Sequence, residues 1–195
     1  MTESQWDKLL RIKTSGRDDS HSDKYHYPYE PTPYSVLERL AQSGYFGKRN
    51  RVLDYGCGKG RVDFFLVHQI GCPCIGVEYD ERIFESALKN KASAVSGSKV
   101  EILCEKAEVY SVPGNVDRMF FFNPFSVEIL KRVINRIRES GDGQERLLFF
   151  YYLSDDYRTW LMTLDELAFV NEIDCRDLFE GENARERILI YKIAY

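Results

Sequence analysis

Residues 52–60, Val-Leu-Asp-Tyr-Gly-Cys-Gly-Lys-Gly, constrain this chain more than any other stretch. An apolar strand end is followed by Asp54, and an apolar-striped helix is expected to begin at Arg61. Three glycines alternate through the turn between them: Gly56, Gly58 and Gly60. Glycine permits positive φ and close approach of a ligand, and a helix start offers unpaired N–H groups. A strand, a glycine turn and a helix start indicate a nucleotide-type ligand site.

The spacing of the glycines restricts the class of ligand that this loop can bind. A dinucleotide fingerprint needs Gly-x-Gly-x-x-Gly, and a phosphate loop ends in Gly-Lys-Ser/Thr. Here the pattern is Asp-x-Gly-x-Gly-x-Gly, and Gly60 is followed by Arg61. The Asp54 carboxylate would repel a pyrophosphate, whereas it would suit a cationic ligand such as the amino group of a methionine-type moiety.

This segment resembles motif I of the class I S-adenosylmethionine-dependent methyltransferases. The resemblance implies S-adenosyl-L-methionine as cofactor and S-adenosyl-L-homocysteine as product. It also implies cofactor contacts from the whole loop: Asp54, Gly56, Cys57, Gly58 and Gly60. A glycine-rich turn in some other α/β protein is the less favoured alternative, because the later segments follow in the order expected of this family.

Length and charge set outer limits. A chain of 195 residues suits one domain with a full core. The net charge of −4 argues against a general nucleic-acid or membrane footprint. No apolar run approaches the roughly 18 residues of a membrane span, and residues 1–13 show no signal-peptide core, so we expect a cytoplasmic protein. The five cysteines are interpreted as reduced core thiols, and neither they nor the histidines have metal-ligand spacing.

Strand-like and helix-like segments alternate along the chain, which predicts an α/β fold with a doubly wound, mostly parallel sheet and helices on both faces. The expected strands are 51–54, 74–78, 100–104, 118–122, 146–153, 168–174 and 187–193. The expected helices are 4–12, one beginning near Pro33, 61–69, 81–90, 127–138 and 155–163. No helical pattern separates the last two strands, so one of the seven should run antiparallel. The resemblance implies the strand order 3-2-1-4-5-7-6.

Ligands of open α/β sheets lie beyond the carboxyl ends of the strands. Glu78 ends the second strand about 20 residues past the glycines, where an acid that binds ribose is expected. The alternative for Glu78 is an acid at a helix N-terminus. Tyr79 could pack on the adenine. After the third strand, the family often has an acid before a small residue; here Lys106 takes that place, so either the Glu105 side chain or the Ala107 backbone could contact the adenine. A solvated loop charge is the alternative for Glu105.

The fourth strand is followed by Asn123-Pro124-Phe125, which resembles motif IV of amino-group methyltransferases but has only one proline. In that motif a side chain and a backbone carbonyl accept hydrogen bonds from the target N–H groups. The resemblance therefore implies that Asn123, Pro124 and Phe125 position the acceptor and that Asn123 also borders the cofactor. An Asx-type turn that caps the helix near Val127 is the equally weighted alternative.

Residues 1–47 are expected to form a helical and extended lid over the cofactor and acceptor, and residues 48–195 the methyltransferase core. The stretch Tyr29-Glu30-Pro31-Thr32-Pro33 resembles a Tyr-x-Pro-Thr-Pro segment of a family subset that includes lysine-directed enzymes. There the segment folds over the cofactor, which makes Tyr29 and Thr32 candidate cofactor contacts. Thr32 is also the expected cap of the helix near Pro33. A proline-stiffened linker that packs tyrosines on the core is the alternative.

Together these features predict direct in-line methyl transfer from S-adenosylmethionine to an acceptor that the sequence does not identify. A protein amine or a small molecule is favoured. One alternative is a nucleic-acid amino-group methyltransferase, suggested by Asn123-Pro124-Phe125 but opposed by the acidic charge and the absence of a target-recognition domain. The other is a non-catalytic module that binds the cofactor. Because the sulfonium is a good leaving group, positioning of the acceptor can supply several kcal/mol of barrier reduction, and no dedicated metal is needed. His26 and the nearby tyrosines are speculative bases for an acceptor that must lose a proton.

Overall fold

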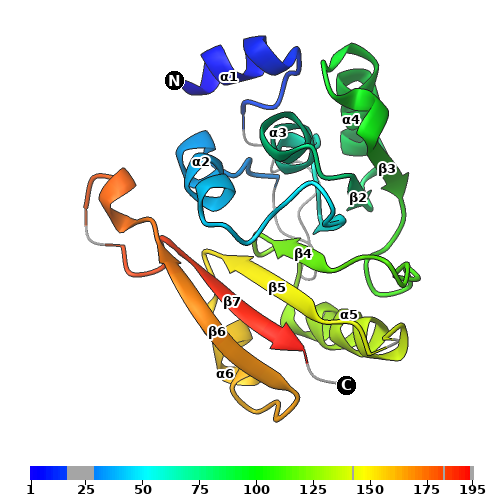
Figure 1. Ribbon diagram of the computed structural model, residues 1–195, viewed down its shortest axis with the longest axis vertical. Helices are drawn as coiled ribbons and strands as arrows, with labels where there is room; N and C mark the ends of the chain where they lie inside the picture. The colour runs from blue at the N-terminus through cyan, green and yellow to red at the C-terminus, as the bar shows by residue number, and fades with distance from the viewer. Residues whose placement is uncertain (17–28, 142, 182, 194–195) are drawn as a thin grey trace.

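The computed structural model describes residues 1–16, 29–141, 143–181 and 183–193 (Figure 1). Seven strands form one sheet in the order β3-β2-β1-β4-β5-β7-β6, which confirms the predicted order. Neighbouring strands from β3 through β5 run parallel, and β7 is antiparallel to both β5 and β6, so the predicted terminal hairpin is present. The strands are β1 (Val52–Tyr55), β2 (Cys74–Glu78), β3 (Val100–Cys104), β4 (Arg118–Phe121), β5 (Arg146–Tyr151), β6 (Leu167–Asp174) and β7 (Arg187–Ile193).

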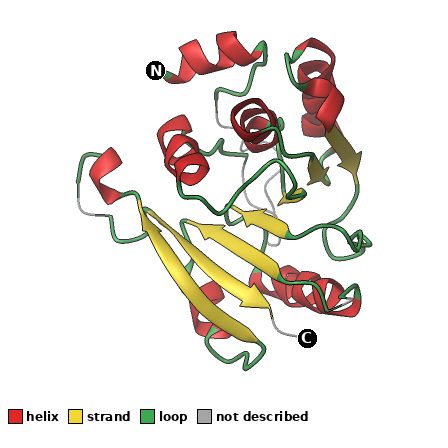
Figure 2. Cartoon of the chain, viewed as in Figure 1, coloured by secondary structure: helices red, strands yellow, loops and turns green. Residues whose placement is uncertain are grey.

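Helices cover both faces of the sheet (Figure 2). The α-helices are α1 (Glu3–Leu10), α2 (Tyr34–Gln42), α3 (Arg61–Ile70), α4 (Glu81–Ser93), α5 (Val127–Glu139) and α6 (Asp155–Leu161). In Figure 1, α1 to α4 lie above the sheet and α5 and α6 below it. Side chains along β5 alternate between two hydrophobic clusters, with Phe149 facing the α2–α3 side and Phe150 facing α5. The parallel strands β1, β2, β4 and β5 are therefore buried on both faces, whereas the antiparallel edge strand β6 is largely exposed.

Several predicted boundaries move for identifiable reasons. Strand β1 runs one residue beyond Asp54, because Tyr55 still pairs with Val77 and Phe121. Strand β5 ends at Tyr151 and not at residue 153, because Tyr152 has a left-handed φ of 55° that breaks the extended chain. The expected cap of α2 is wrong: Pro33 occupies the N-cap position and no side chain caps it, while the Tyr34 N–H donates to Glu3 Oε1 at 2.9 Å.

The N-terminal helices share the core of the sheet. Trp6 and Leu10 of α1 and Leu37 of α2 are buried in the same cluster as Phe65 of α3, and the rings of Trp6 and Phe65 meet edge to face at 5.0 Å. This packing places Thr14, after α1, and Thr32, before α2, against Arg61 at the start of α3. In the described ranges, no helix is both long and apolar enough to cross a membrane.

Candidate functional site

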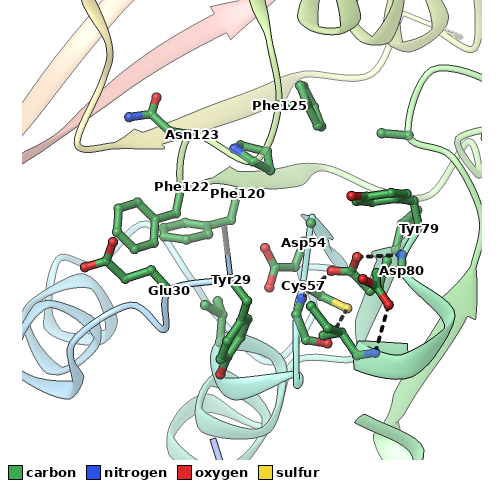
Figure 3. Close-up of a pocket in the computed structure, with 18 of the residues that line it drawn as sticks. Tyr29, Glu30, Asp54, Cys57, Tyr79, Asp80, Phe120, Phe122, Asn123 and Phe125 are labelled. Atoms are coloured by element: carbon green, nitrogen blue, oxygen red, sulfur yellow. Dashed lines mark hydrogen bonds between the residues drawn. The ribbon is translucent and has the colours of Figure 1, made fainter. Parts of the chain in front are cut away.

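A cleft opens at the carboxyl ends of β1, β2 and β4, beside the point where the sheet order reverses (Figure 3). It encloses about 970 Å³ of space that is continuous with solvent. Thirteen of the fourteen residues predicted for the site line it: Tyr29, Thr32, Asp54, Gly56, Cys57, Gly58, Glu78, Tyr79, Glu105, Ala107, Asn123, Pro124 and Phe125. Gly60 is the exception. The sequence therefore located the cleft, although the roles assigned to these residues stay predictions.

The glycine loop is tied to β2 through its backbone. The N–H groups of Gly56 and Cys57 donate to the Val77 carbonyl at 2.9 and 3.1 Å. Two glycines allow the cleft walls to touch the loop: a Cβ on Gly56 would lie 2.4 Å from the Pro124 ring, and one on Gly58 would lie 2.3 Å from the Tyr29 ring. The loop thus brings the N-terminal segment and the chain after β4 to opposite sides of one site.

Gly60 has a different place. It is the N-cap of α3 with a φ of 83°, and a Cβ there would lie 2.6 Å from the Phe64 ring. Its position is explained by helix packing, since it does not border the cleft.

Glu78 is anchored at both carboxylate oxygens. Oε1 accepts from the Asp80 N–H at 2.9 Å and Oε2 accepts from the Gly58 N–H at 3.0 Å. The side chain is only 6% exposed, and burial raises the pKa of its carboxyl group. The alternative interpretation of Glu78 is an acid at a helix N-terminus. Asp80 takes that position, since its carboxylate accepts from the Arg82 and Ile83 N–H groups at the N-terminus of α4. A carboxylate has about four lone-pair sites, so Glu78 keeps capacity for a ligand hydroxyl beyond its backbone partners.

Asp54 supplies a second buried carboxyl group, which points into the cleft in Figure 3. It is 3% exposed, and burial together with the charge of Glu78 raises its pKa. Behind it lies Asp63 of α3, which is fully buried and which sequence reasoning missed. The available signal was an acid within the otherwise apolar run Val62 to Val67.

Arg61 is a second residue that the sequence reasoning missed. Its Nε donates to Thr14 Oγ1 at 2.7 Å, one of its amino groups donates to the Thr32 carbonyl at 3.1 Å, and it forms an ion pair with Glu3. Its guanidinium also stacks on the Tyr34 ring at 4.3 Å. The first residue of α3 thereby ties both parts of the N-terminal segment to the glycine loop.

Tyr29 lies on the same N-terminal side of the cleft. Its hydroxyl donates to the Thr14 carbonyl at 2.6 Å, while its ring covers Gly58 and the Lys59 amino group lies 4.6 Å from the ring centre. The neighbouring base candidate, His26, lies outside the described residues.

The chain after β3 approaches the cleft from the other side. The Glu105 N–H donates to the Glu78 carbonyl at 3.0 Å, and its side chain is exposed, while Ala107 is buried. Both residues border the cleft, as does the half-buried Tyr79. The choice between Glu105 and Ala107 as the adenine contact therefore stays open.

Asn123 faces the adjacent strand end. Its Nδ2 donates to the Tyr152 carbonyl and its Oδ1 accepts from the Ser154 N–H at 3.2 Å. In Figure 3 its amide points away from Asp54. The alternative that Asn123 caps α5 is wrong, because Ser126 is the N-cap residue and no side-chain hydrogen bond caps that helix. Asn123 instead joins the end of β4 to the turn after β5.

The cleft is strongly acidic. Six carboxylic side chains line it: Glu30, Asp54, Glu78, Asp80, Glu105 and Glu108. The two arginines that line it, Arg61 and Arg82, are both ion-paired, with Glu3 and Asp80 respectively. A concave surface with this excess of acid favours cationic ligands. Among the residues that the structure describes, no cluster of histidine, cysteine and acidic side chains could hold a metal ion.

Comparisons with known proteins support this interpretation of the fold. No protein-family model matches the chain. It is 29% identical over 96 residues to a protein-lysine N-methyltransferase of Saccharolobus islandicus, covering 45% of this chain and 60% of the relative. It is 31% identical over 65 residues to a tRNA1(Val) (adenine(37)-N6)-methyltransferase of Bacteroides fragilis, covering 33% of this chain and 27% of the relative.

A solved RNA methyltransferase from Salinibacter ruber, in complex with S-adenosyl-L-homocysteine, superposes with a TM-score of 0.60. Its sequence is 18% identical, and the match covers 85% of this chain and 93% of that structure. The chain thus covers most of that solved structure but only part of each curated relative, 60% and 27% of their lengths.

Proposed function

We propose that this chain, which has the Rossmann-like fold of the class I S-adenosylmethionine-dependent methyltransferases, transfers a methyl group from S-adenosylmethionine. The observation that carries the proposal is the pairing of two buried carboxyl groups across one glycine loop. Glu78 is fixed by two backbone N–H groups, and Asp54 lies at the floor of the same cleft. These two acceptor groups fit a ligand with a pair of hydroxyls at one end and a cation at the other.

The proposed cofactor contacts follow from the cleft. Glu78 accepts hydrogen bonds from the ribose hydroxyls and Asp54 binds the methionine ammonium group, while Gly56, Cys57 and Gly58 pass close beneath. Tyr79 and either Glu105 or Ala107 border the adenine. Tyr29, bonded to the Thr14 carbonyl, and Thr32, bonded to Arg61, close the site from the N-terminal side, so residues 1–47 act as a lid on the core formed by residues 48–195.

When bound, the cofactor supplies a methyl group on a sulfonium that is already a good leaving group. The chain's own contribution is to hold the acceptor in line and to exclude water. Transfer would require a free lone pair on the acceptor, so a protonated amine would first release a proton to solvent. The sulfur would then keep the electron pair of the broken sulfur–methyl bond, and S-adenosyl-L-homocysteine would leave. Asn123, Pro124 and Phe125 form the wall on the acceptor side, with Asn123 fixing that wall to the turn after β5.

The proposed acceptor is an amine of a protein or a small molecule. The acidic cleft supports a cationic acceptor, and its lining includes both the Glu30 carboxylate and the Phe122 ring, two groups that attract a cation. The similarity to a protein-lysine methyltransferase points the same way. The second candidate, a nucleic-acid amino group, is supported by the similarity to a tRNA adenine methyltransferase, but the acidic cleft opposes a polyanion.

A cytoplasmic location is also proposed, since all five cysteines are free thiols.

The test is methyl transfer from S-adenosylmethionine labelled in its methyl group into a lysate of the source organism, sorted into protein, nucleic acid and small molecules. Label in protein or in small-molecule amines supports the proposal, and label in nucleic acid supports the second candidate. Glu78→Ala is the matched negative control. No label at a cofactor concentration that saturates the protein would contradict catalysis and favour a non-catalytic binding module.

A further inference from the structure

We infer that Asp63 is a positioning residue for the cofactor. Its carboxyl group stays protonated and donates a hydrogen bond to Asp54, which directs the charged Asp54 carboxylate toward the ammonium end of the ligand. This inference rests on the proposed function. It assigns a role to a buried acid that the fold alone does not explain.

The position of Asp63 is unusual for a carboxyl group. It lies in the first turn of α3 and is 0% exposed. Within the described part of the chain, no well-aligned N–H or hydroxyl donor reaches either of its carboxyl oxygens. A buried carboxyl without such a partner is costly, so a compensating interaction is expected.

The surroundings place that interaction at Asp54. Asp54 and Gly76 are partners in the register of β1 and β2, so they lie side by side on the sheet. A Cβ on Gly76 would lie 3.0 Å from Asp63 Oδ2 and 2.6 Å from Cys57 Sγ. The absent side chain of Gly76 therefore makes room for the Asp63 carboxyl beside Asp54, and the two carboxyl groups lie within reach of a shared proton.

Two adjacent buried carboxyl groups cannot both be charged without a nearby cation. The ionisable groups whose charges interact with Asp63 are acids or thiols: Asp54 on β1, Cys57 in the loop, Cys72 just before β2 and Cys74 on β2. Glu78, at the end of β2, acts on Asp54. Burial keeps the pKa of the Cys57 and Cys74 thiols well above the usual value, so they carry no charge at neutral pH. Arg61 is directed to its partners Glu3, Thr14 and Thr32.

The proton belongs on the more buried member of the pair. Asp63 has no contact with the cleft, whereas Asp54 borders it, so the charged form is better solvated at Asp54. Burial and the charge of Asp54 raise the pKa of Asp63 well above its usual value, in agreement with this assignment. Burial and the charge of Glu78 raise the pKa of Asp54 to about 8, so its negative charge develops when the ammonium group of the ligand binds, and Asp63 fixes the orientation of that charge from behind.

Binding of two ligands separates this role from a structural one. S-adenosyl-L-homocysteine carries the ammonium group, whereas 5′-methylthioadenosine carries the adenine and ribose without it. Calorimetric titration of Asp63→Ala should show affinity for S-adenosyl-L-homocysteine reduced roughly tenfold to a hundredfold, the scale of a hydrogen bond to a charged group. Affinity for 5′-methylthioadenosine should stay within about twofold of the wild type. Asp63→Asn, whose amide can still donate to Asp54, should recover most of the loss.

Equal losses for both ligands would overturn the inference, because they would mean that Asp63 only shapes the loop. Unchanged affinity of Asp63→Ala for S-adenosyl-L-homocysteine, or no recovery in Asp63→Asn, would overturn it as well. Thermal melting of each variant checks that it is folded. Failure of the cofactor assignment has a different signature, since the wild-type protein would then bind neither ligand. Failure of methyl transfer alone would leave both affinities of the wild-type protein intact.

Discussion

The two sides of the cleft are built in different ways. On the side of β1 and β2, backbone N–H groups hold the glycine loop and Glu78, and the carboxyl groups that face the ligand are buried. On the side of β4 and β5, the wall consists of aromatic rings and of Asn123, whose amide is engaged with the turn after β5. The first side is fixed by main-chain geometry, and the second is set by loops.

The second side is held from further away. Asn123 and Tyr152 both have left-handed φ values, 39° and 55°, and they are hydrogen-bonded to each other. Arg185, from the chain before β7, stacks on the Tyr152 ring at 4.3 Å and donates to the Tyr152 carbonyl at 3.2 Å. Non-glycine residues in this conformation persist only where their surroundings enforce it. We propose that the shape of the acceptor wall depends on the β6–β7 connection, whereas the cofactor side depends on the glycine loop and on the N-terminal contacts of Arg61.

The largest expected effect is a loss of cofactor affinity when Glu78, on the side of β1 and β2, is replaced. Glu78→Ala removes the carboxylate that accepts from the Gly58 and Asp80 N–H groups and, under the proposal, both ribose contacts. Affinity for S-adenosyl-L-homocysteine should fall about a hundredfold, as for two hydrogen bonds to a charged group. Calorimetry measures this, with the exposed Glu81→Ala as control and Glu78→Gln expected to fall between. Wild-type affinity in Glu78→Ala would remove Glu78 from the site.

A second change tests how the cofactor side is closed. Arg61→Ala removes the buried guanidinium that joins Glu3, Thr14 and Thr32, so the free energy of unfolding should fall by about 2 kcal/mol. Affinity for S-adenosyl-L-homocysteine should fall with it if residues 1–47 act as a lid. Urea denaturation and calorimetry measure the two effects, with the exposed Arg49→Ala as control. Lower stability with unchanged affinity would restrict the N-terminal segment to a structural role.

A third change sharpens the contrast by acting on the other side. Asn123→Ala loses both amide hydrogen bonds to the turn after β5, so the rate of methyl transfer should fall about tenfold while cofactor affinity is unchanged. Asn123→Gly suits the left-handed φ and also lacks the amide, so it separates backbone strain from hydrogen bonding. Matching losses of affinity and rate would show that the two sides are not independent.

The smallest expected effect concerns stability against pH. The pKa of Asp63 is raised in the folded state above the unfolded value of about 3.9, so the folded protein binds more protons and its stability falls as pH rises between the two values. Asp63→Asn lacks this titration. It should be more stable than the wild type by about 1 kcal/mol at high pH, with the difference shrinking toward pH values of about 4. Thermal melting across this range measures the difference, and a constant difference would contradict the assignment.

The same contrast explains what could be predicted from the sequence. Strand β2, strand β3 and the role of Glu78 as a strand-end residue follow from local patterns, because the glycine spacing and the apolar runs act over a few residues. The partners of Asn123 and Arg61 could not be predicted, since they lie 29 residues or more away in the chain at Tyr152, Thr32 and Thr14. Asp63 was hidden for a similar reason: its neighbours Asp54 and Gly76 are brought to it only by the pairing of β1 with β2.

The central claim is that this cleft binds S-adenosylmethionine, and calorimetric titration of the wild-type protein tests it most directly, with NADH as the matched nucleotide control. We predict saturable binding of S-adenosylmethionine and of S-adenosyl-L-homocysteine at one site and no binding of NADH, because the acidic cleft repels a pyrophosphate. Preference for NADH, or binding of none of the three, would contradict the account.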